Sequence, residues 1–329
     1  MENNHGPTLV IHGGAGTIVR NKFTEEKLQE HREALKDSLK VGYEILSKGG
    51  SSIDAVEASV RVMEDCPLFN AGKGSVFTKG GKNELEASIM LGISSHTAGA
   101  CTLLRTVKNP ISLAKTLLLD PDNPHVFLGG IEAENYAKSK GLEIVDPGYF
   151  FTELRWKQHL DGLEKGKISE NSENIISIIG KDIDDEFNQD PTGTVGAIAV
   201  DVNGIIAVAT STGGFNNKKE GRIGDTPLIS SGTWVDNETC GVSGTGNGEY
   251  FIRYSVAHDV SARMKYLGES VHEAATNVVK DLKKVGGDGG VIALDKYGNF
   301  SMPFNTSGMY RGYIRVSEGV PYVYIFDDE

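Results

Sequence analysis

The most informative stretch of this sequence is residues 191–212, which read Pro-Thr-Gly-Thr-Val-Gly-Ala-Ile-Ala-Val-Asp-Val-Asn-Gly-Ile-Ile-Ala-Val-Ala-Thr-Ser-Thr. Its apolar and β-branched residues predict two strands, 194–200 and 205–210. Between them, Asn203-Gly204 supplies the positive φ angles of a tight turn. We therefore expect a β-hairpin here, with Thr194 as the first residue of its first strand.

Similar patterns extend outward from this hairpin. A second hairpin is predicted at 290–304, and apolar residues recur at helical spacing, for example from Leu28 to Leu46. The predicted helices are 24–47, 52–64, 110–119, 249–266 and 270–284, and the other predicted strands are 8–12, 84–90 and 98–106. Runs of strands alternating with runs of helices indicate an α+β protein with antiparallel sheets and helices packed outside them. The 329 residues fit a single large domain, 1–329.

The region before the first hairpin differs from the rest of the chain. Between residues 161 and 190 acidic residues outnumber basic ones, with Ser, Asn and Gly among them. Such a composition buries little apolar surface. We expect a mobile linker over about 155–193, with a short ordered piece at 175–179.

The overall composition excludes several classes of protein. Hydrophobic residues make up 39% of the chain, enough for a buried core, and the net charge of −12 disfavours binding to nucleic acid or to anionic membranes. No stretch approaches the roughly 18 apolar residues of a membrane helix, and residues 1–7 lack the features of a signal peptide. Three cysteines without a CxxC pair favour a reducing compartment, so we expect a cytoplasmic protein.

Gly193-Thr194 offers a candidate nucleophile. If the bond between these residues is cut, Thr194 gains a free α-amine with a pKa of about 7.7–8.0, which can take the proton from its own hydroxyl. Gly193 would favour the cut, since it can hold the scissile peptide in a conformation closed to other residues. Thr and Gly also suit a strand and a loop for structural reasons alone, and the segment by itself leaves both interpretations open.

Two further segments carry groups that could bind a substrate. Arg222 and Asp225 lie three residues apart, and they could hold the carboxylate and the ammonium of an amino acid, although an isolated pair of this kind is more often a surface ion pair. The segment 244–249, Gly-Thr-Gly-Asn-Gly-Glu, leads into a predicted helix and could stabilise an oxyanion. A phosphate cradle is the rival interpretation, and the absence of a complete phosphate-binding motif disfavours it.

The order and spacing of short motifs over nearly the whole chain resemble the plant-type L-asparaginase/isoaspartyl peptidase family of N-terminal nucleophile hydrolases. The motifs are His-Gly-Gly-Ala-Gly at 12–16, Pro-Leu-Phe-Asn-Ala-Gly at 67–72, Glu-Ala-Ser-Ile-Met at 86–90, Gly-Thr-Val-Gly-Ala at 193–197, Thr-Ser-Thr-Gly-Gly at 210–214, Gly-Arg-Ile-Gly-Asp-Thr-Pro at 221–227 and Pro-Phe-Asn-Thr at 303–306. Only the linker and the extreme ends have no counterpart among these motifs. The resemblance implies a four-layer αββα sandwich with two mostly antiparallel sheets between helices.

The resemblance also implies a self-cleaving precursor and a role for particular residues. Cleavage before Thr194 would leave chains 1–193 and 194–329. These two chains would form one αβ unit, and two such units would pair into a homodimer. Thr194 would be the nucleophile, with Thr212 supporting it. Thr245 and Gly246 would form the oxyanion hole. The implied substrate-binding residues are Arg222, Asp225, Gly246, Gly248 and Asn70. No catalytic cofactor is implied, but a structural sodium ion is, bound by the backbone carbonyls of Met63, Glu64, Cys66, Phe69, Ala71 and Lys73.

From these observations we expect an autoprocessing threonine hydrolase that cleaves isoaspartyl dipeptides and L-asparagine and releases L-aspartate. Its substrates would be small molecules, without nucleic acid or membrane partners. Two alternatives remain: a non-processed protein that binds an amino acid or nucleotide, and an aspartylglucosaminidase-like amidase. Gly193 disfavours the second, because the scissile bond of that branch typically follows an Asp.

Overall fold

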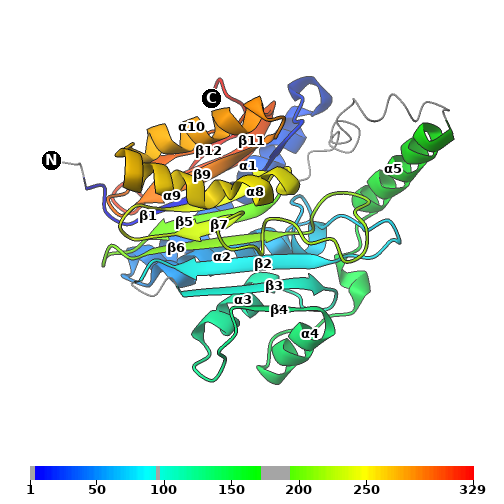
Figure 1. Ribbon diagram of the computed structural model, residues 1–329, viewed down its shortest axis with the longest axis horizontal. Helices are drawn as coiled ribbons and strands as arrows, with labels where there is room; N and C mark the ends of the chain where they lie inside the picture. Colours follow the sequence, from blue (N-terminus) through cyan, green and yellow to red (C-terminus); the bar gives the residue numbers. More distant parts are fainter. Residues whose placement is uncertain (1–3, 94–96, 172–192) are drawn as a thin grey trace.

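Two β-sheets lie face to face in the computed structural model, which describes residues 4–93, 97–171 and 193–329 (Figure 1). The larger sheet has the order β12-β11-β1-β5-β6-β2-β3-β4 and the smaller one β10-β9-β8-β7. The strands of the larger sheet are β1 (Thr8–Gly16), β2 (Leu85–Leu91), β3 (Thr97–Leu104), β4 (Phe127–Gly129), β5 (Val195–Val200), β6 (Ile206–Thr212), β11 (Gly308–Arg315) and β12 (Tyr322–Tyr324). Those of the smaller sheet are β7 (Thr233–Val235), β8 (Cys240–Gly246), β9 (Gly289–Asp295) and β10 (Phe300–Ser301). Neighbouring strands run antiparallel, except that β3 and β4 are parallel.

Helices cover the outer face of each sheet. The helices are α1 (Glu25–Ser47), α2 (Ser52–Asp65), α3 (Pro110–Leu119), α4 (Gly130–Ser139), α5 (Glu153–Asn171), α8 (Gly248–Tyr254), α9 (Val256–Leu267) and α10 (Val271–Lys284). α1, α2 and α3 pack on the larger sheet, α9 and α10 pack on the smaller one, and β5 and β6 contact β8 across the interior (Figure 1). The four-layer α+β architecture expected from the sequence is therefore confirmed.

The layers explain why the central strands are apolar on both faces. In β1, Leu9 and Ile11 belong to the core beneath the helices, whereas Val10 belongs to the core between the sheets. Ile198 of β5 and Ile292 of β9 meet in that second core. Because successive side chains of a strand point to opposite faces, a strand between two layers buries every residue.

Most predicted elements are present, and several parts of the chain differ from the expectation. The helix predicted at 249–266 is two helices, because Ser255 adopts a left-handed conformation (φ +49°) that ends α8 and begins α9. The first part of the segment expected to be a linker is instead α5, while the short ordered piece expected at 175–179 lies outside the described residues. The strands β4, β7, β8, β11 and β12 were not predicted from the sequence pattern.

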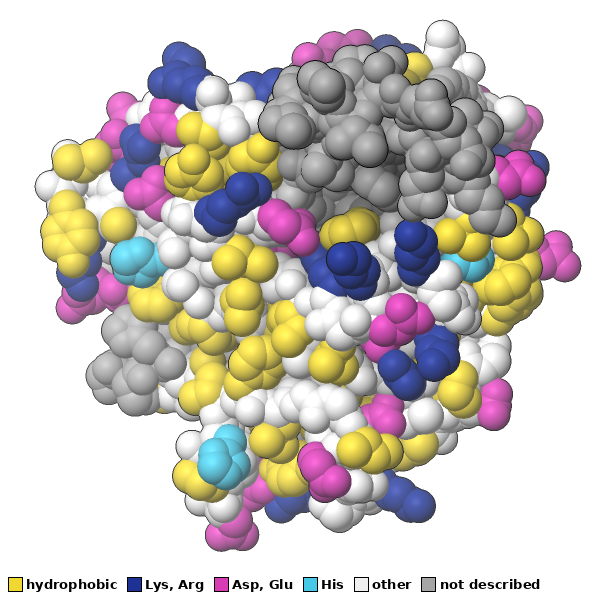
Figure 2. Space-filling model, turned by 45° about the vertical axis from the view of Figure 1, so that its right-hand side comes forward, with side chains coloured by type: hydrophobic (Ala, Val, Ile, Leu, Met, Phe, Trp, Pro, Cys, Tyr) yellow, Lys and Arg dark blue, Asp and Glu magenta, His cyan; other side chains and the backbone are white. Residues whose placement is uncertain are grey.

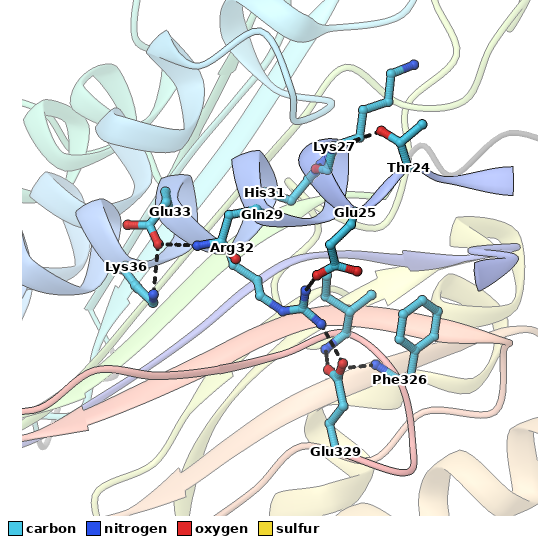
Figure 3. Close-up of polar contacts among 11 residues, drawn as sticks. Thr24, Glu25, Lys27, Gln29, His31, Arg32, Glu33, Lys36, Phe326 and Glu329 are labelled. Carbon is cyan, nitrogen blue, oxygen red and sulfur yellow. Dashed lines mark hydrogen bonds and ion pairs between the residues drawn. The ribbon is translucent and has the colours of Figure 1, made fainter. Parts of the chain in front are cut away.

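The end of the chain is tied to the first helix (Figure 3). The Glu329 side chain accepts hydrogen bonds from the backbone N–H groups of Ile325 and Phe326 and forms an ion pair of 2.6 Å with Arg32 of α1. Arg32 also contacts Glu25 in the first turn of that helix. These contacts hold the segment after β12 against the outer helix layer.

The surface carries charges of both signs. On the face shown in Figure 2, lysine and arginine side chains are interspersed with acidic and apolar ones. In the described ranges, no helix combines the length and the apolar character that crossing a bilayer requires.

Candidate active site

Thr194 lies at the centre of the larger sheet, immediately before β5, and its exposed fraction is 6%. β5 pairs with β6 so that Val195 is opposite Ser211. Continued by one residue, this register places Thr194 opposite Thr212, and directly opposite residues of antiparallel strands project from the same face of a sheet. The two threonines that the sequence assigned to the nucleophile and its support are therefore neighbours.

The face that carries them is the one toward the smaller sheet. Thr210 lies two residues before Thr212 and so shares its face, and its hydroxyl is 2.8 Å from that of Ser243 in β8. Ser243 in turn lies 2.9 Å from the His12 imidazole Nε2. A polar contact between the sheets thus runs directly beside the start of β5.

His12 is a neutral side chain in this setting. Burial lowers the pKa of its imidazole to about 3, and the opposing hydrogen bond with the Thr194 backbone is weaker. A base with so low a pKa is a poor proton acceptor for a threonine hydroxyl near neutral pH. The structure therefore offers no titrating histidine at this position to activate Thr194.

The peptide before Thr194 is packed against the end of β1. A Cβ atom on Gly193 would lie 2.3 Å from the Cα of Gly14, and one on Gly14 would lie 2.7 Å from the Cα of Gly193. Gly14 also has a φ of +116°, which side chains other than hydrogen rarely allow. The two backbones can approach this closely only because both positions are glycine. The Gly193–Thr194 bond therefore lies in a closely packed corner.

Thr245 and Gly246 reach the same corner from the smaller sheet. The Thr245 hydroxyl is fully buried at the end of β8 and accepts a hydrogen bond of 3.1 Å from the N–H of Ala15, next to Gly14. A hydroxyl that accepts from an N–H can still donate its own proton. Gly246 has a φ of +149°, and a Cβ there would lie 2.3 Å from the Asp288 carbonyl oxygen. This position therefore requires glycine.

Arg222 and Asp225 belong to a loop of residues 221–225, which we call the recognition loop. A Cβ on Gly248 would lie 2.7 Å from both the Arg222 Nη2 and the Asp225 Oδ1. Both side chains therefore converge on the Cα of Gly248, at the first turn of α8. Three residues that the sequence assigned to substrate binding are brought together at one point.

The Asp225 carboxyl group is poised for a cationic partner. Burial raises its pKa to about 7, while the neighbouring Arg222 opposes that shift. Its Oδ2 is buried and has no hydrogen-bond partner among the described residues. An ammonium group placed here would supply the missing donor and stabilise the ionised form.

Arg222 is held by Glu249 and lies close to the loop that follows Thr212. Its Nε and Nη2 donate to the Glu249 carboxylate at 3.1 and 2.9 Å, and its guanidinium lies over the ring of Phe215. A Cβ on Gly214 would lie 3.2 Å from Arg222 Nη1, and the Gly214 N–H donates to the Thr212 hydroxyl at 3.0 Å. The guanidinium and the threonine pair thus border the same loop.

Asn70 anchors that loop from the other side. Its side-chain N–H donates to the Gly214 carbonyl at 2.6 Å, its Oδ1 accepts from the N–H of Val76, and its backbone carbonyl accepts from Gly213. The side chain that the sequence placed in the pocket wall therefore also shapes the turn after Thr212.

Backbone carbonyl groups of the segment 63–73 pack closely against glycines at its end. A Cβ on Gly72 would lie 2.2 Å from the Glu64 carbonyl oxygen, and one on Gly74 would lie 2.0 Å from that of Phe69. Backbone carbonyls are ligands suited to a hard cation such as sodium. In the described part of the chain, no group of three or more His, Cys, Asp or Glu side chains could hold a metal ion.

Several charged residues beside this site were not predicted from the sequence to have a role. Glu84 and Glu86 are buried on either side of the start of β2, Lys218 is buried in the loop after β6, and Glu249 pairs with Arg222. Glu84 and Glu86 alternate with apolar residues in a predicted strand, which places two acidic residues on the face toward the interior. This alternation was the signal in the sequence that could have pointed to Glu84 and Glu86, because carboxylates are rarely buried without a specific partner.

Two sheets between helix layers, with a threonine at the start of a central strand, are typical of the class of N-terminal nucleophile amidohydrolases. Comparison with known proteins places the chain within that class: residues 5–323 match the model of the asparaginase family, so the chain belongs to this family.

Relatives with known names agree with this assignment. The chain is 42% identical to "Isoaspartyl peptidase" of Escherichia coli K12, over 93% of this chain and 92% of that protein. It is 41% identical to "Isoaspartyl peptidase" of Salmonella typhimurium, over 93% and 94%. It is 38% identical to "Isoaspartyl peptidase/L-asparaginase" of Bos taurus, over 92% and 91%.

Proposed function

We propose that this protein is an enzyme that hydrolyses the side-chain amide of L-aspartyl groups, in isoaspartyl dipeptides and in L-asparagine, and releases L-aspartate. The observation that carries this proposal is the convergence of Arg222 and Asp225 on Gly248, beside the loop that follows Thr212. A cation and a carboxyl group at one point match the α-carboxylate and α-ammonium of an amino acid. The names of the relatives support the same substrate class.

The proposed enzyme matures by cutting its own chain before Thr194, leaving residues 1–193 and 194–329. In the uncut chain the nitrogen of Thr194 belongs to an amide and cannot act as a base. Hydrolysis of the Gly193–Thr194 bond converts this nitrogen into an amine on the Thr194 Cα, next to the Cβ that bears the hydroxyl. The close packing of Gly193 on Gly14 supports the proposal, because it holds the scissile peptide in one position.

In the proposed reaction, the Thr194 amine takes the hydroxyl proton and Oγ1 attacks the β-carbonyl carbon of the substrate. The resulting oxyanion accepts hydrogen bonds from the Thr245 hydroxyl and the Gly246 N–H. The proton passes to the leaving nitrogen, the C–N bond breaks, and ammonia or an amino acid departs. Water then attacks the ester, with the amine again as base, and L-aspartate leaves. Arg222 and Asp225 hold the unreacting end of the substrate throughout.

Three further features belong to the proposal. A sodium ion bound by the carbonyls of the segment 63–73 would stiffen the bend that carries Asn70. The mature αβ units would pair into a homodimer. A cytoplasmic location is supported by the three free cysteines, Cys66, Cys101 and Cys240.

Mass spectrometry of purified protein aged at neutral pH tests the proposal. We expect two chains, the second beginning at Thr194, and hydrolysis of β-aspartyl dipeptides and L-asparagine. The variant Thr194→Ala should remain one chain and be inactive, with Thr192→Ala as the matched control that still matures. A wild-type protein that stays uncut yet binds amino acids would support the non-processed binder instead. Faster cleavage of glycosylated asparagine than of β-aspartyl dipeptides would support the aspartylglucosaminidase-like alternative.

A further inference from the structure

Glu86 lies in the same row of side chains as the threonine pair. It is opposite Thr212 in the pairing of β2 with β6. On the other side of β6, the pairing with β5 continued by one residue places Thr194 opposite the same Thr212. The three side chains therefore project from the same face of three adjacent strands. With strands about 4.8 Å apart, Glu86 begins about 10 Å from Thr194. It is 1% exposed, so its carboxylate acts inside the protein.

The Glu86 carboxylate binds the recognition loop. Its Oε1 and Oε2 accept from the N–H of Gly224 at 3.1 and 3.2 Å, and Oε2 also accepts from the Thr102 hydroxyl at 3.2 Å. Gly224 is the residue directly before Asp225. One strand thus joins the threonine row to the loop that holds the substrate.

Glu84 binds the other end of the same loop. Its Oε2 accepts from the N–H of Gly221 at 2.8 Å, and its Oε1 forms an ion pair of 2.6 Å with Arg105. Its side chain is 2% exposed. Two buried carboxylates therefore hold the N–H groups of Gly221 and Gly224, and Arg222 lies between these two points.

A buried lysine completes this cluster. The Lys218 ammonium donates to the Glu84 carbonyl at 2.7 Å, and a Cβ on Gly214 would lie within 3.0 Å of its Nζ. Burial lowers the pKa of Lys218, while the nearby Glu86 and Glu84 favour its charged form. The cluster places charges of opposite sign next to the Arg222 guanidinium, so that buried cations and anions compensate one another.

We propose that Glu84 and Glu86 are positioning residues that fix the recognition loop at a set distance from Thr194. Through their bonds to Gly221 and Gly224 they keep the Arg222 guanidinium where only a substrate with a free α-carboxylate aligns its β-carbonyl with the nucleophile. This inference rests on the proposed function, since it concerns the specificity of that reaction. Loosening the loop should reduce discrimination at the α-carboxylate more than it reduces chemistry on the amide.

The test compares two β-aspartyl dipeptides, one with a free α-carboxylate on the aspartyl residue and one with that group amidated. The readout is the ratio of kcat/KM for the two substrates, measured on protein shown by mass spectrometry to be cleaved and normalised to the cleaved fraction. We expect Glu86→Ala to lower this ratio about tenfold, mainly by raising KM for the free-carboxylate substrate. A tenfold change corresponds to about 1.4 kcal/mol, which is the loss expected when one well-aligned contact is removed. Glu84→Ala should lower the ratio in the same direction, and it serves alone if Glu86→Ala does not fold.

Two variants separate positioning from a general structural role. Glu86→Gln keeps an oxygen that can accept the Gly224 N–H, so it should retain most of the wild-type ratio. Asp295→Ala is the matched control: Asp295 is a buried carboxylate that accepts from the N–H groups of Tyr297 and Asn299, at the end of β9 remote from Thr245. It should lower the melting temperature and leave the ratio unchanged.

Several results would overturn the inference. Equal losses of kcat/KM for both substrates would show a purely structural role, as would a ratio within twofold of the wild type in the alanine variants. A Glu86→Gln variant as impaired as Glu86→Ala would show that the charge, and not the bond to Gly224, is what matters. Failure of the proposed function is distinct from all of these, because the wild-type protein would then hydrolyse neither substrate.

Discussion

Lowering the pH from 8 to 6 should weaken the binding of L-aspartate about tenfold, because protonation of Asp225 competes with the α-ammonium group. Burial raises the pKa of Asp225 to about 7, so the carboxyl group is mostly ionised at pH 8 and mostly protonated at pH 6. A ligand that needs the ionised form then binds more weakly by the factor 1 + 10^(pKa − pH), which is about 11 at pH 6 and about 1.1 at pH 8. Its own ammonium stays charged over this range.

The inhibition constant of L-aspartate as a competitive inhibitor is the appropriate measurement. It reports binding alone, whereas kcat also contains the titration of the Thr194 amine. Asp225→Asn is the control: it should bind L-aspartate weakly at both pH values and lose the pH dependence. An inhibition constant that stays constant between pH 6 and 8, or that falls as the pH falls, would refute the assignment of Asp225 to the ammonium group.

Three further predictions concern other parts of the fold. Burial raises the pKa of Glu64 to about 8, so the folded state binds more protons than the unfolded state between about pH 4.5 and pH 8. Thermal unfolding should therefore show a stability that falls as the pH rises to 8. The variant Glu64→Gln should lose this dependence on pH. Thr245→Val should reduce kcat by about 10²–10³-fold on cleaved protein, the usual effect of one oxyanion-hole donor, while Thr245→Ser should keep most of it. Ser255→Gly should raise the free energy of unfolding by about 1 kcal/mol in denaturant titrations, because Ser255 adopts a left-handed conformation at φ +49°; a decrease would show that its side chain matters more than this strain.

Much of the fold could be predicted from local patterns. The hairpin of β5 and β6 follows from Asn203-Gly204 between two apolar runs, and α1 and α2 follow from helical spacing with Thr24 and Ser51 at their N-caps. The local signal failed at Ser255, where a single residue in an unusual conformation divides one helical pattern into two helices. It also failed for β4, β7 and β12, which have three residues each, too few for a pattern to show. The longer strands β8 and β11 contain glycines that interrupt the alternation of apolar residues.

The candidate site was predictable in its residue types and not in its geometry. Thr194, Arg222 and Asp225 were singled out from the chemistry of their side chains and from the resemblance of the surrounding motifs. Their spacing along the chain does not show that Arg222 and Asp225 meet at Gly248, or that Glu249 holds the guanidinium. These contacts depend on how the recognition loop folds back on α8.

By itself, then, the sequence determined the properties that depend on neighbours along the chain: many of the strands and helices, the turn of the first hairpin and the identity of the candidate reactive groups. Only the tertiary structure decided that Thr212 and Glu86 share one row, and that Thr245 from the smaller sheet reaches Ala15 beside Gly193. The physical reason is that strand order and register are settled by burial of apolar faces contributed by segments more than a hundred residues apart. A short motif does not indicate which distant strands pair with one another.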